Sequence, residues 1–174
     1  MNSNITIREV QKSEYNQLGQ LMIDVYSRLD GFPSQKEQPN YYEKLANIGV
    51  LNEQRDTKVL IAISSDTKIL GGVVFFSDMA MYGSGGTATS EKDASGIRLL
   101  GIDPQFRNSG VGKALTHACI QMAKEAGHSQ VILHTTQAMQ VAWKMYQKIG
   151  FIRSTDLDFM QENLQVFGFR HKLV

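Results

Sequence analysis

In the first 50 residues, apolar and polar side chains alternate first with the two-residue period of a strand and then with the spacing of a helix. Residues 5–7 alternate apolar and polar side chains, which predicts a short strand. Apolar side chains recur at helical spacing over residues 18–29. A second helix is expected from Pro39, which suits a first helical turn, to Gly49, which ends it. One strand and two helices are therefore predicted before residue 50.

A hairpin and a long loop follow. Residues 58–63 and 69–77 read as strands, and the polar residues 64–67 join them as a hairpin. Residues 79–94 are small, polar and rich in glycine, so we expect a mobile loop that carries Tyr82 near its tip. A loop of this length inside a compact domain often has a functional role.

Strands and helices alternate after residue 95. They are expected at residues 96–102 (strand), 111–122 (helix), 131–135 (strand), 138–149 (helix), 151–153 (strand) and 166–172 (strand). The strand–helix–strand order after a hairpin predicts an α/β fold, with a mixed, twisted seven-stranded sheet and helices on both faces. The length favours one domain over residues 1–174.

Composition and charge exclude several classes of protein. Eighteen lysines and arginines oppose seventeen aspartates and glutamates, so bulk charge does not support nucleic-acid binding. The single cysteine, Cys119, excludes an internal disulfide and a cysteine zinc cluster, and its helical position predicts core packing. The longest apolar runs, residues 59–63 and 69–76, are far shorter than the roughly 18 residues that span a bilayer. The start MNSNITIREV lacks the apolar core of a secretory signal, so we expect a cytoplasmic protein without a membrane partner.

The sharpest chemical signal is LGIDPQFRNSGVGKAL, residues 100–115, where a strand ends, a turn follows and a helix begins. Consecutive main-chain N–H groups and the helix N-terminus predict a phosphate site. Gly110 and Gly112 would let a phosphate approach the main chain, and Arg107 and Lys113 add positive charge.

Two common phosphate motifs do not fit this segment. A nucleotide P-loop requires a hydroxyl where Ala114 stands and a glycine where Arg107 stands. The dinucleotide fingerprint requires a third glycine where Leu115 stands.

Two blocks together carry a family resemblance. RNSGVG, residues 107–112, resembles the coenzyme A pyrophosphate loop of the GNAT acyltransferase superfamily. AWKMYQKIGF, residues 142–151, resembles the A-x-x-x-Y-x-x-x-G-F block that this family carries on its next helix. The order of elements also matches, so the resemblance covers nearly the whole chain, while the specific motifs lie within residues 97–151.

The resemblance implies acetyl-CoA as cofactor and assigns roles to individual residues. The main chain of Leu100 and Ile102 would pair with the pantetheine arm, in a gap between splayed strands 96–102 and 131–135. Two catalytic roles are implied: Tyr146 would protonate the leaving thiolate, and the Ile102 amide would face the thioester oxygen as an oxyanion donor. No metal is implied. The residues implied to bind the cofactor are Leu100, Ile102, Arg107, Asn108, Ser109, Gly110, Val111, Gly112, Lys113, Met139, Ala142 and Tyr146.

Two positions depart from the family pattern. Met139 stands seven residues before Tyr146, where many relatives carry an asparagine that touches the cofactor arm. Gly96 stands where many relatives carry a glutamate that serves as general base. The missing carboxylate favours attack by an amine that is already neutral, or a water relay.

Several side chains have both a functional and a structural interpretation. His134 could be a base or a hydrogen-bonded structural histidine. Arg98 could bind an acidic acceptor or pair with Asp93 or Glu91. The aromatic residues around the second helix lie where the family covers its acceptor: one could line that site, and at least one tyrosine should pack in the core; they are Phe32, Tyr41 and Tyr42.

The implied activity is N-acetyltransfer from acetyl-CoA to a primary amine of a small molecule, by direct transfer in a ternary complex. Two alternatives stay open. Gly96 and Met139 would suit a non-catalytic acyl-CoA sensor. An open groove between the Tyr41 helix and the 79–94 loop would suit a peptide or protein acceptor. The exposed terminal strands are compatible with a homodimer.

Overall fold

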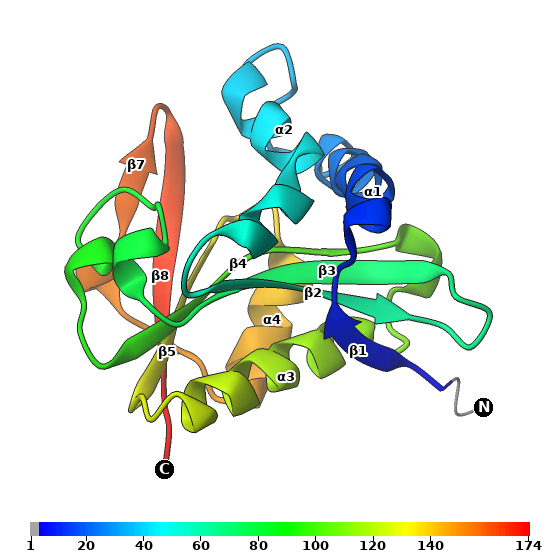
Figure 1. The fold of residues 1–174 in the computed structure, drawn as a ribbon. Helices are drawn as coiled ribbons and strands as arrows, with labels where there is room; N and C mark the ends of the chain where they lie inside the picture. The colour runs from blue at the N-terminus through cyan, green and yellow to red at the C-terminus, as the bar shows by residue number, and fades with distance from the viewer. Residues whose placement is uncertain (1–3) are drawn as a thin grey trace.

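The structure is a computed structural model that describes residues 4–174. Its strands form one sheet in the order β1-β2-β3-β4-β5-β8-β6, and β7 adds to β8 beside this path (Figure 1). β4 and β5 run parallel and the other pairs run antiparallel, so the sheet is mixed as predicted. The strands are β1 (Thr6–Glu9), β2 (Thr57–Ile63), β3 (Ile69–Phe76), β4 (Ala94–Ile102), β5 (Gln130–Thr135), β6 (Ile152–Arg153), β7 (Phe159–Gln161) and β8 (Leu164–Lys172).

The predicted number of strands was wrong by one. β7 has three residues and lies in the polar stretch that separates the last two predicted strands. It pairs with β8 from Phe159 opposite Val166 to Gln161 opposite Leu164. Three residues are too few for a periodic apolar pattern, which is why the sequence did not indicate this strand.

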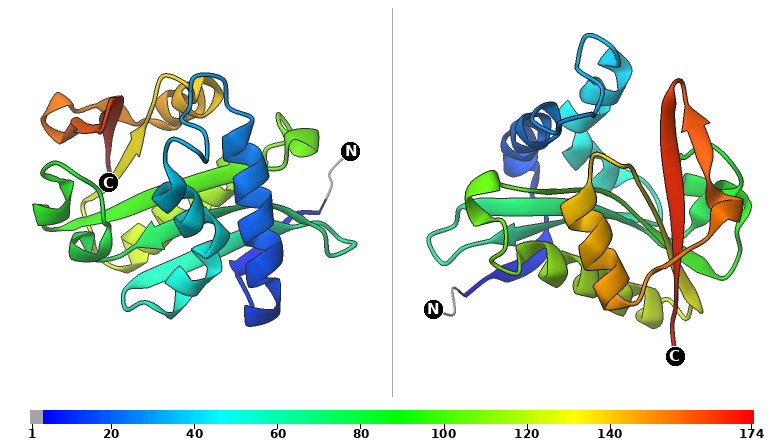
Figure 2. Two further views of the ribbon diagram at one scale, coloured as in Figure 1. Left: turned by 90° about the horizontal axis from the view of Figure 1, so that it is seen from above. Right: turned by 180° about the vertical axis from the view of Figure 1, so that it is seen from behind.

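Helices cover both faces of the sheet, which confirms the predicted layers. α1 (Tyr15–Ser27) and α2 (Pro39–Ala46) lie on one face, and α3 (Val111–Glu125) and α4 (Gln140–Ile149) lie on the other (Figures 1 and 2). Each face has its own cluster of buried apolar side chains. α2 ends earlier than expected, and a 3-10 turn at Ile48–Glu53 continues the chain.

β4 and β5 separate part-way along their length. Residues Ala94–Ile97 of β4 pair with Gln130–Leu133 of β5, and the two strands form no pairs beyond Ile97 and Leu133. On the other side of β4, Leu99 and Leu100 stand opposite the single residue Val73 of β3, and Leu99 has a φ of +59°. This β-bulge bends β4 away from β5, because the extra residue increases local twist. The predicted splay of these strands is present.

The segment before β4 contains short helical turns and buries Tyr82, so the expectation of a mobile loop that carries Tyr82 near its tip was wrong. It contains two 3-10 turns, at Met79–Met81 and Ala88–Ser90. Tyr82 is fully buried and its ring lies against Gly96. The sequence concealed this contact because the glycine that makes room for the ring lies fourteen residues away in the chain.

Three expectations from composition concern the described residues. Cys119 is fully buried, and burial raises the pKa of its thiol well above the usual range, so it is a core residue as predicted. Within residues 4–174 no helix is long and apolar enough to cross a membrane. The same part of the chain holds no cluster of three or more side chains suited to a metal ion.

Candidate active site

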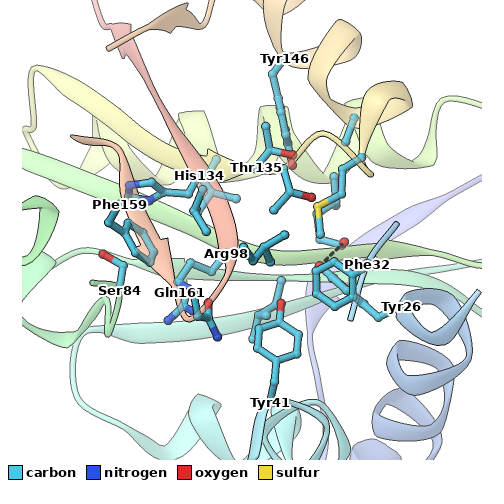
Figure 3. A pocket seen from close by; sticks show the side chains of 18 residues that line it. Tyr26, Phe32, Tyr41, Ser84, Arg98, His134, Thr135, Tyr146, Phe159 and Gln161 are labelled. Atoms are coloured by element: carbon cyan, nitrogen blue, oxygen red, sulfur yellow. Dashed lines mark hydrogen bonds between the residues drawn. The ribbon is translucent and has the colours of Figure 1, made fainter. Parts of the chain in front are cut away.

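A pocket of about 690 Å³, counted with its opening to solvent, lies over the gap between β4 and β5. Tyr146 reaches into it from α4 and Tyr41 from the opposite side (Figure 3). The lining contains one charged side chain, Arg98, and no carboxylate. Its polar side chains are Tyr26, Tyr41, Ser84, Arg98, His134, Thr135, Thr136, Tyr146 and Gln161.

The end of β4 offers a free main-chain edge to this gap. The N–H of Asp103 donates to the carbonyl of Leu70 on β3, 2.9 Å away. Because main-chain groups alternate sides along a strand, those of Ile102 and Leu100 are directed away from β3, toward the gap. Leu100 lines the pocket, and its carbonyl accepts a hydrogen bond from the Tyr26 hydroxyl at 2.9 Å. Ile102 lies beyond the lining residues.

The segment between β4 and α3 presents a run of unused donors. Within residues 4–174, no main-chain N–H from position 107 to position 113 donates a hydrogen bond to the protein. Three of these groups belong to the first turn of α3, where the helix dipole adds positive potential. Arg107 and Lys113 are exposed and form no ion pair with another described residue. Unused N–H groups and two exposed cations are a combination that is suited to an anion.

Gly110 and Gly112 differ in how the structure would respond to a side chain at each position. Gly110 has a φ of +87°, and a Cβ there would meet nothing within 4 Å, so backbone conformation requires the glycine. A Cβ on Gly112 would lie 3.3 Å from Sδ of Met145 and 3.6 Å from Cγ1 of Ile102. A side chain at position 112 would therefore be a tight fit between α3, α4 and β4, and Met145 would have to move by a few tenths of an ångström.

Tyr146 presents a protonated hydroxyl to the pocket. Its ring is buried and packs edge-on against Phe151, 5.6 Å between centroids. The hydroxyl forms no hydrogen bond with another described residue. Burial raises the pKa of Tyr146 well above 10, so the hydroxyl keeps its proton at neutral pH. Ala142 and Met139, from the start of α4, line the same wall.

The position of the missing carboxylate is filled. A Cβ added to Gly96 would lie 2.5 Å from the ring of Tyr82 and 2.9 Å from Sδ of Met79. Since real Cβ atoms do not approach other atoms so closely, a glutamate there would displace both side chains.

His134 is a hydrogen-bonded structural histidine, the second of the two interpretations of this residue. Its Nε2 lies 2.8 Å from the carbonyl oxygen of Leu157, which can only accept, so Nε2 carries the proton. Nδ1 then accepts from the Tyr82 hydroxyl at 2.8 Å. Burial lowers the pKa of His134, which favours this neutral form. Both ring nitrogens are used, so neither is free to take a proton from an acceptor.

Arg98 does not form the predicted ion pair. Glu91 binds Arg170 at 2.6 Å, and Asp93 accepts from the N–H of Ser129 at 3.0 Å. Arg98 instead turns into the pocket, where its Nη1 donates to the main-chain oxygen of Tyr82 at 2.8 Å.

The aromatic residues near α2 divide as expected. Phe32 and Tyr41 line the pocket, with ring centroids 5.5 Å apart. Tyr42 is fully buried and donates to the carbonyl of Pro33 at 2.8 Å. Trp143 on α4 packs edge-on against two phenylalanines of β8.

Several lining residues escaped the sequence analysis, among them Thr135, Thr136 and Tyr26. Thr135 and Thr136 are buried, and neither hydroxyl has a partner among the described residues. Thr135 ends β5 and Thr136 follows it. The sequence pattern of this strand is that of an ordinary core strand, so the exposure of these two residues to the pocket depends on the separation of β4 and β5. Tyr26 follows the apolar stripe of α1, where its hydroxyl gave no separate signal.

Comparison with known proteins decides the family. The model of the acetyltransferase (GNAT) family matches residues 21–151. The chain belongs to this family. It is 30% identical over 81 residues to a mycothiol acetyltransferase of Nocardiopsis dassonvillei, which is 47% of this chain and 24% of that protein. The chain spans about a quarter of the length of the curated relatives it matches.

Solved GNAT structures share the fold over nearly the whole chain. A GNAT acetyltransferase of Staphylococcus aureus superposes with a TM-score of 0.75 at 19% identity, covering 98% of this chain and 100% of that one. The PaiA N-acetyltransferase of Thermoplasma acidophilum, solved with coenzyme A, gives 0.73 at 17% identity, covering 98% and 99%. The predicted α/β acyltransferase fold is thereby confirmed.

Proposed function

We propose that this GNAT protein is an N-acetyltransferase that moves an acetyl group from acetyl-CoA to a primary amine of a small molecule, directly within a ternary complex. One observation carries the proposal: a free strand edge and an unpaired tyrosine hydroxyl border the same gap in the sheet, and a loop with unused main-chain N–H groups follows directly after that strand. The name of the mycothiol acetyltransferase relative, and the coenzyme A in the PaiA structure, support acetyl transfer from this cofactor.

The residues present fit acetyl-CoA. The seven free N–H groups of residues 107–113, with Arg107 and Lys113, would hold the pyrophosphate. The free edge of β4 at Leu100 and Ile102 would pair with the amide-bearing pantetheine arm like an added strand. Asn108 and Ser109 of the same loop, and Val111 at the start of α3, would contribute through their main chain. Met139 and Ala142 would cover the arm from the start of α4, with an apolar contact at Met139.

Acetyl-CoA supplies an activated acyl group and a thiolate that leaves readily. Tyr146 holds a proton at its hydroxyl and would donate it to the sulfur as the carbon–sulfur bond breaks. The Ile102 amide is the proposed oxyanion donor, and the Leu100 amide, which lies nearer the pocket, is the second candidate. The attacking nitrogen forms the new carbon–nitrogen bond and releases one proton to water, and Tyr146 regains one from water.

The acceptor must arrive as a neutral amine, because no carboxylate lines the pocket and His134 has no free nitrogen. The pocket itself favours that form. Arg98 is the one charged side chain among the lining residues, and its positive charge would disfavour an acceptor ammonium relative to the neutral amine.

The shape of the pocket supports a small acceptor over a protein. Gln161 on β7 donates to the side-chain oxygen of Gln38, the residue before α2, at 3.2 Å. This contact links β7, which contributes to the pocket lining, to the residue before α2. An extended peptide would need an open groove there.

Thermal unfolding tests the cofactor, and release of free thiol tests the reaction. A ligand at about 100 times its dissociation constant adds ~2.7 kcal/mol of stability, which should raise the melting temperature by very roughly 5 °C for acetyl-CoA and CoA and not for ATP. Thiol release with a panel of amines should follow. No shift with acetyl-CoA would refute the proposal, and a shift without thiol release would indicate a sensor.

A further inference from the structure

Arg98 is an uncompensated cation inside the acceptor side of the pocket. It projects from β4 and is about half-buried. None of the ion pairs among residues 4–174 includes it. A cation in a partly dry pocket normally has a carboxylate partner, since removal from water is costly otherwise. The partner is therefore expected to arrive with a ligand.

The guanidinium is held in place by neutral groups. Nη1 donates to the main-chain oxygen of Tyr82, and the guanidinium carbon lies 5.5 Å from the centroid of the Tyr82 ring. A Cβ on Gly83 would lie 3.2 Å from Nη1, so the glycine leaves the space that the guanidinium needs. Nε and Nη2 of Arg98 donate to no other described residue. A planar fork with free donors is suited to a carboxylate.

Apart from Arg98, the side chains that line the pocket carry no carboxylate, and its tyrosines and histidine are neutral. Burial raises the pKa of Tyr41 to about 12, and the pKa of Tyr26 is also well above 10, so both hydroxyls stay protonated. His134 is neutral, and Lys44 on α2 adds positive charge. Nothing lining the pocket offsets the charge of Arg98.

Two buried hydroxyls give an independent indication of a ligand. Thr135 and Thr136 are 3% and 4% exposed, and both line this pocket. Neither Oγ1 atom has a hydrogen-bond partner among the described residues. Because a buried unpaired hydroxyl is costly, a ligand with acceptor oxygens would be bound favourably here.

We propose that Arg98 binds a carboxylate of the acceptor, so that the acceptor is a small amine that also carries a carboxylate, as an amino acid does. This inference rests on the proposed function and names the substrate class for it. A carboxylate matches the single positive charge and the planar donors, whereas a phosphate dianion would leave excess negative charge in the pocket.

Turnover of matched acceptors tests the inference. Each of several amino acids is compared with its carboxamide and with the amine that lacks the carboxyl group, using thiol release. We expect kcat/KM to favour the carboxylate by roughly 10- to 100-fold, the usual range for a charge-assisted hydrogen bond. The preference should vanish in Arg98→Met, survive in part in Arg98→Lys, and persist in Arg55→Met, which removes an exposed arginine that is paired elsewhere.

Binding separates this inference from the proposed function. The same trios, with phosphorylethanolamine added, are titrated calorimetrically into the CoA-saturated protein, and into the free protein if CoA does not bind. Binding of the carboxylate-bearing amine that is lost in Arg98→Met supports the inference, whether or not thiol is released. Absence of thiol release would refute only the proposed function. Four outcomes would overturn the inference about Arg98. They are equal binding across a trio, no binding of any member, an unchanged preference in Arg98→Met, and a preference for phosphorylethanolamine. Melting temperatures check that the variants are folded.

Discussion

The ring of Tyr82 occupies the space that any side chain at Gly96 would need. A Cβ there would lie 2.5 Å from the ring. The Tyr82 hydroxyl donates to His134, which in turn donates to the carbonyl of Leu157. The absence of the common family carboxylate is therefore part of a packed arrangement that joins the loop before β4, the end of β5 and the segment before β7.

The first prediction follows from this packing. Gly96→Glu should not restore a general base and should lower the free energy of unfolding by roughly 3 kcal/mol, because the new side chain overpacks the core. Chemical denaturation measures the loss. In the double variant with Tyr82→Ala, the loss should be smaller than the sum of the single losses, since the ring that clashes is gone. Strict additivity would show that Tyr82 is not what excludes a side chain at position 96.

The second prediction concerns the proton donor. Tyr146→Phe should lower kcat by roughly 10- to 100-fold, while the dissociation constant of acetyl-CoA stays nearly unchanged. The effect is modest because a thiolate leaves readily even without a donor. Steady-state kinetics and calorimetry separate the two quantities. Unchanged turnover would remove Tyr146 from the chemistry.

Tyr42→Phe is the matched control for loss of a tyrosine hydroxyl. Tyr42 donates to Pro33 in the core, so its variant should lose about 1 kcal/mol of stability and keep kcat. Tyr146→Phe should instead keep its stability and lose kcat, since its hydroxyl has no hydrogen-bond partner among the described residues. The raised pKa of Tyr146 also means that its deprotonation should not limit the rate below pH 10.

The sequence predicted the fold and the cofactor-side motifs because both depend on local pattern. Helical stripes, the glycine-rich helix start and the two family blocks are each readable within a few residues. Tyr82, Thr135 and Gln161 could not be assigned, because their surroundings come from segments far apart in the chain. The direction of the Arg98 side chain could not be predicted either, because it depended on Glu91 and Asp93 having other partners, Arg170 and Ser129. The roles of the site residues, the single domain and the homodimer remain predictions.

The third prediction compares the two ends of α3. Gly110 and Gly127 have φ values of +87° and +78°, and a Cβ on either would meet nothing within 4 Å. Gly110→Val and Gly127→Val should therefore suffer similar backbone strain, about 1–2 kcal/mol or somewhat more for a branched side chain. Only Gly110→Val should weaken CoA binding, by roughly tenfold or more, because it disturbs the free N–H groups.

Calorimetric titration of CoA into both variants provides the comparison, and melting temperatures report the shared strain. Equal CoA affinity in the two variants would place the pyrophosphate away from residues 107–113. Weakened binding in both would indicate an effect of strain on the whole helix.

The last prediction is a pH dependence of stability that comes from His134. Burial lowers the pKa of His134 in the folded chain below the value near 6.5 of an unfolded chain. The hydrogen bond to the carbonyl of Leu157 opposes this shift, Arg98 adds to it, and Asp158 opposes it slightly. The unfolded chain then binds more protons in the window below pH 6.5, so the contribution of His134 is fully present above this value and falls as the pH decreases. Protonation would also remove the acceptor for the Tyr82 hydroxyl. The free energy of unfolding of the wild type should fall more steeply from pH 7.5 to 5.5 than that of His134→Gln, which can still donate and accept but cannot titrate. Parallel slopes for the two proteins would show that His134 is not neutral in the folded chain.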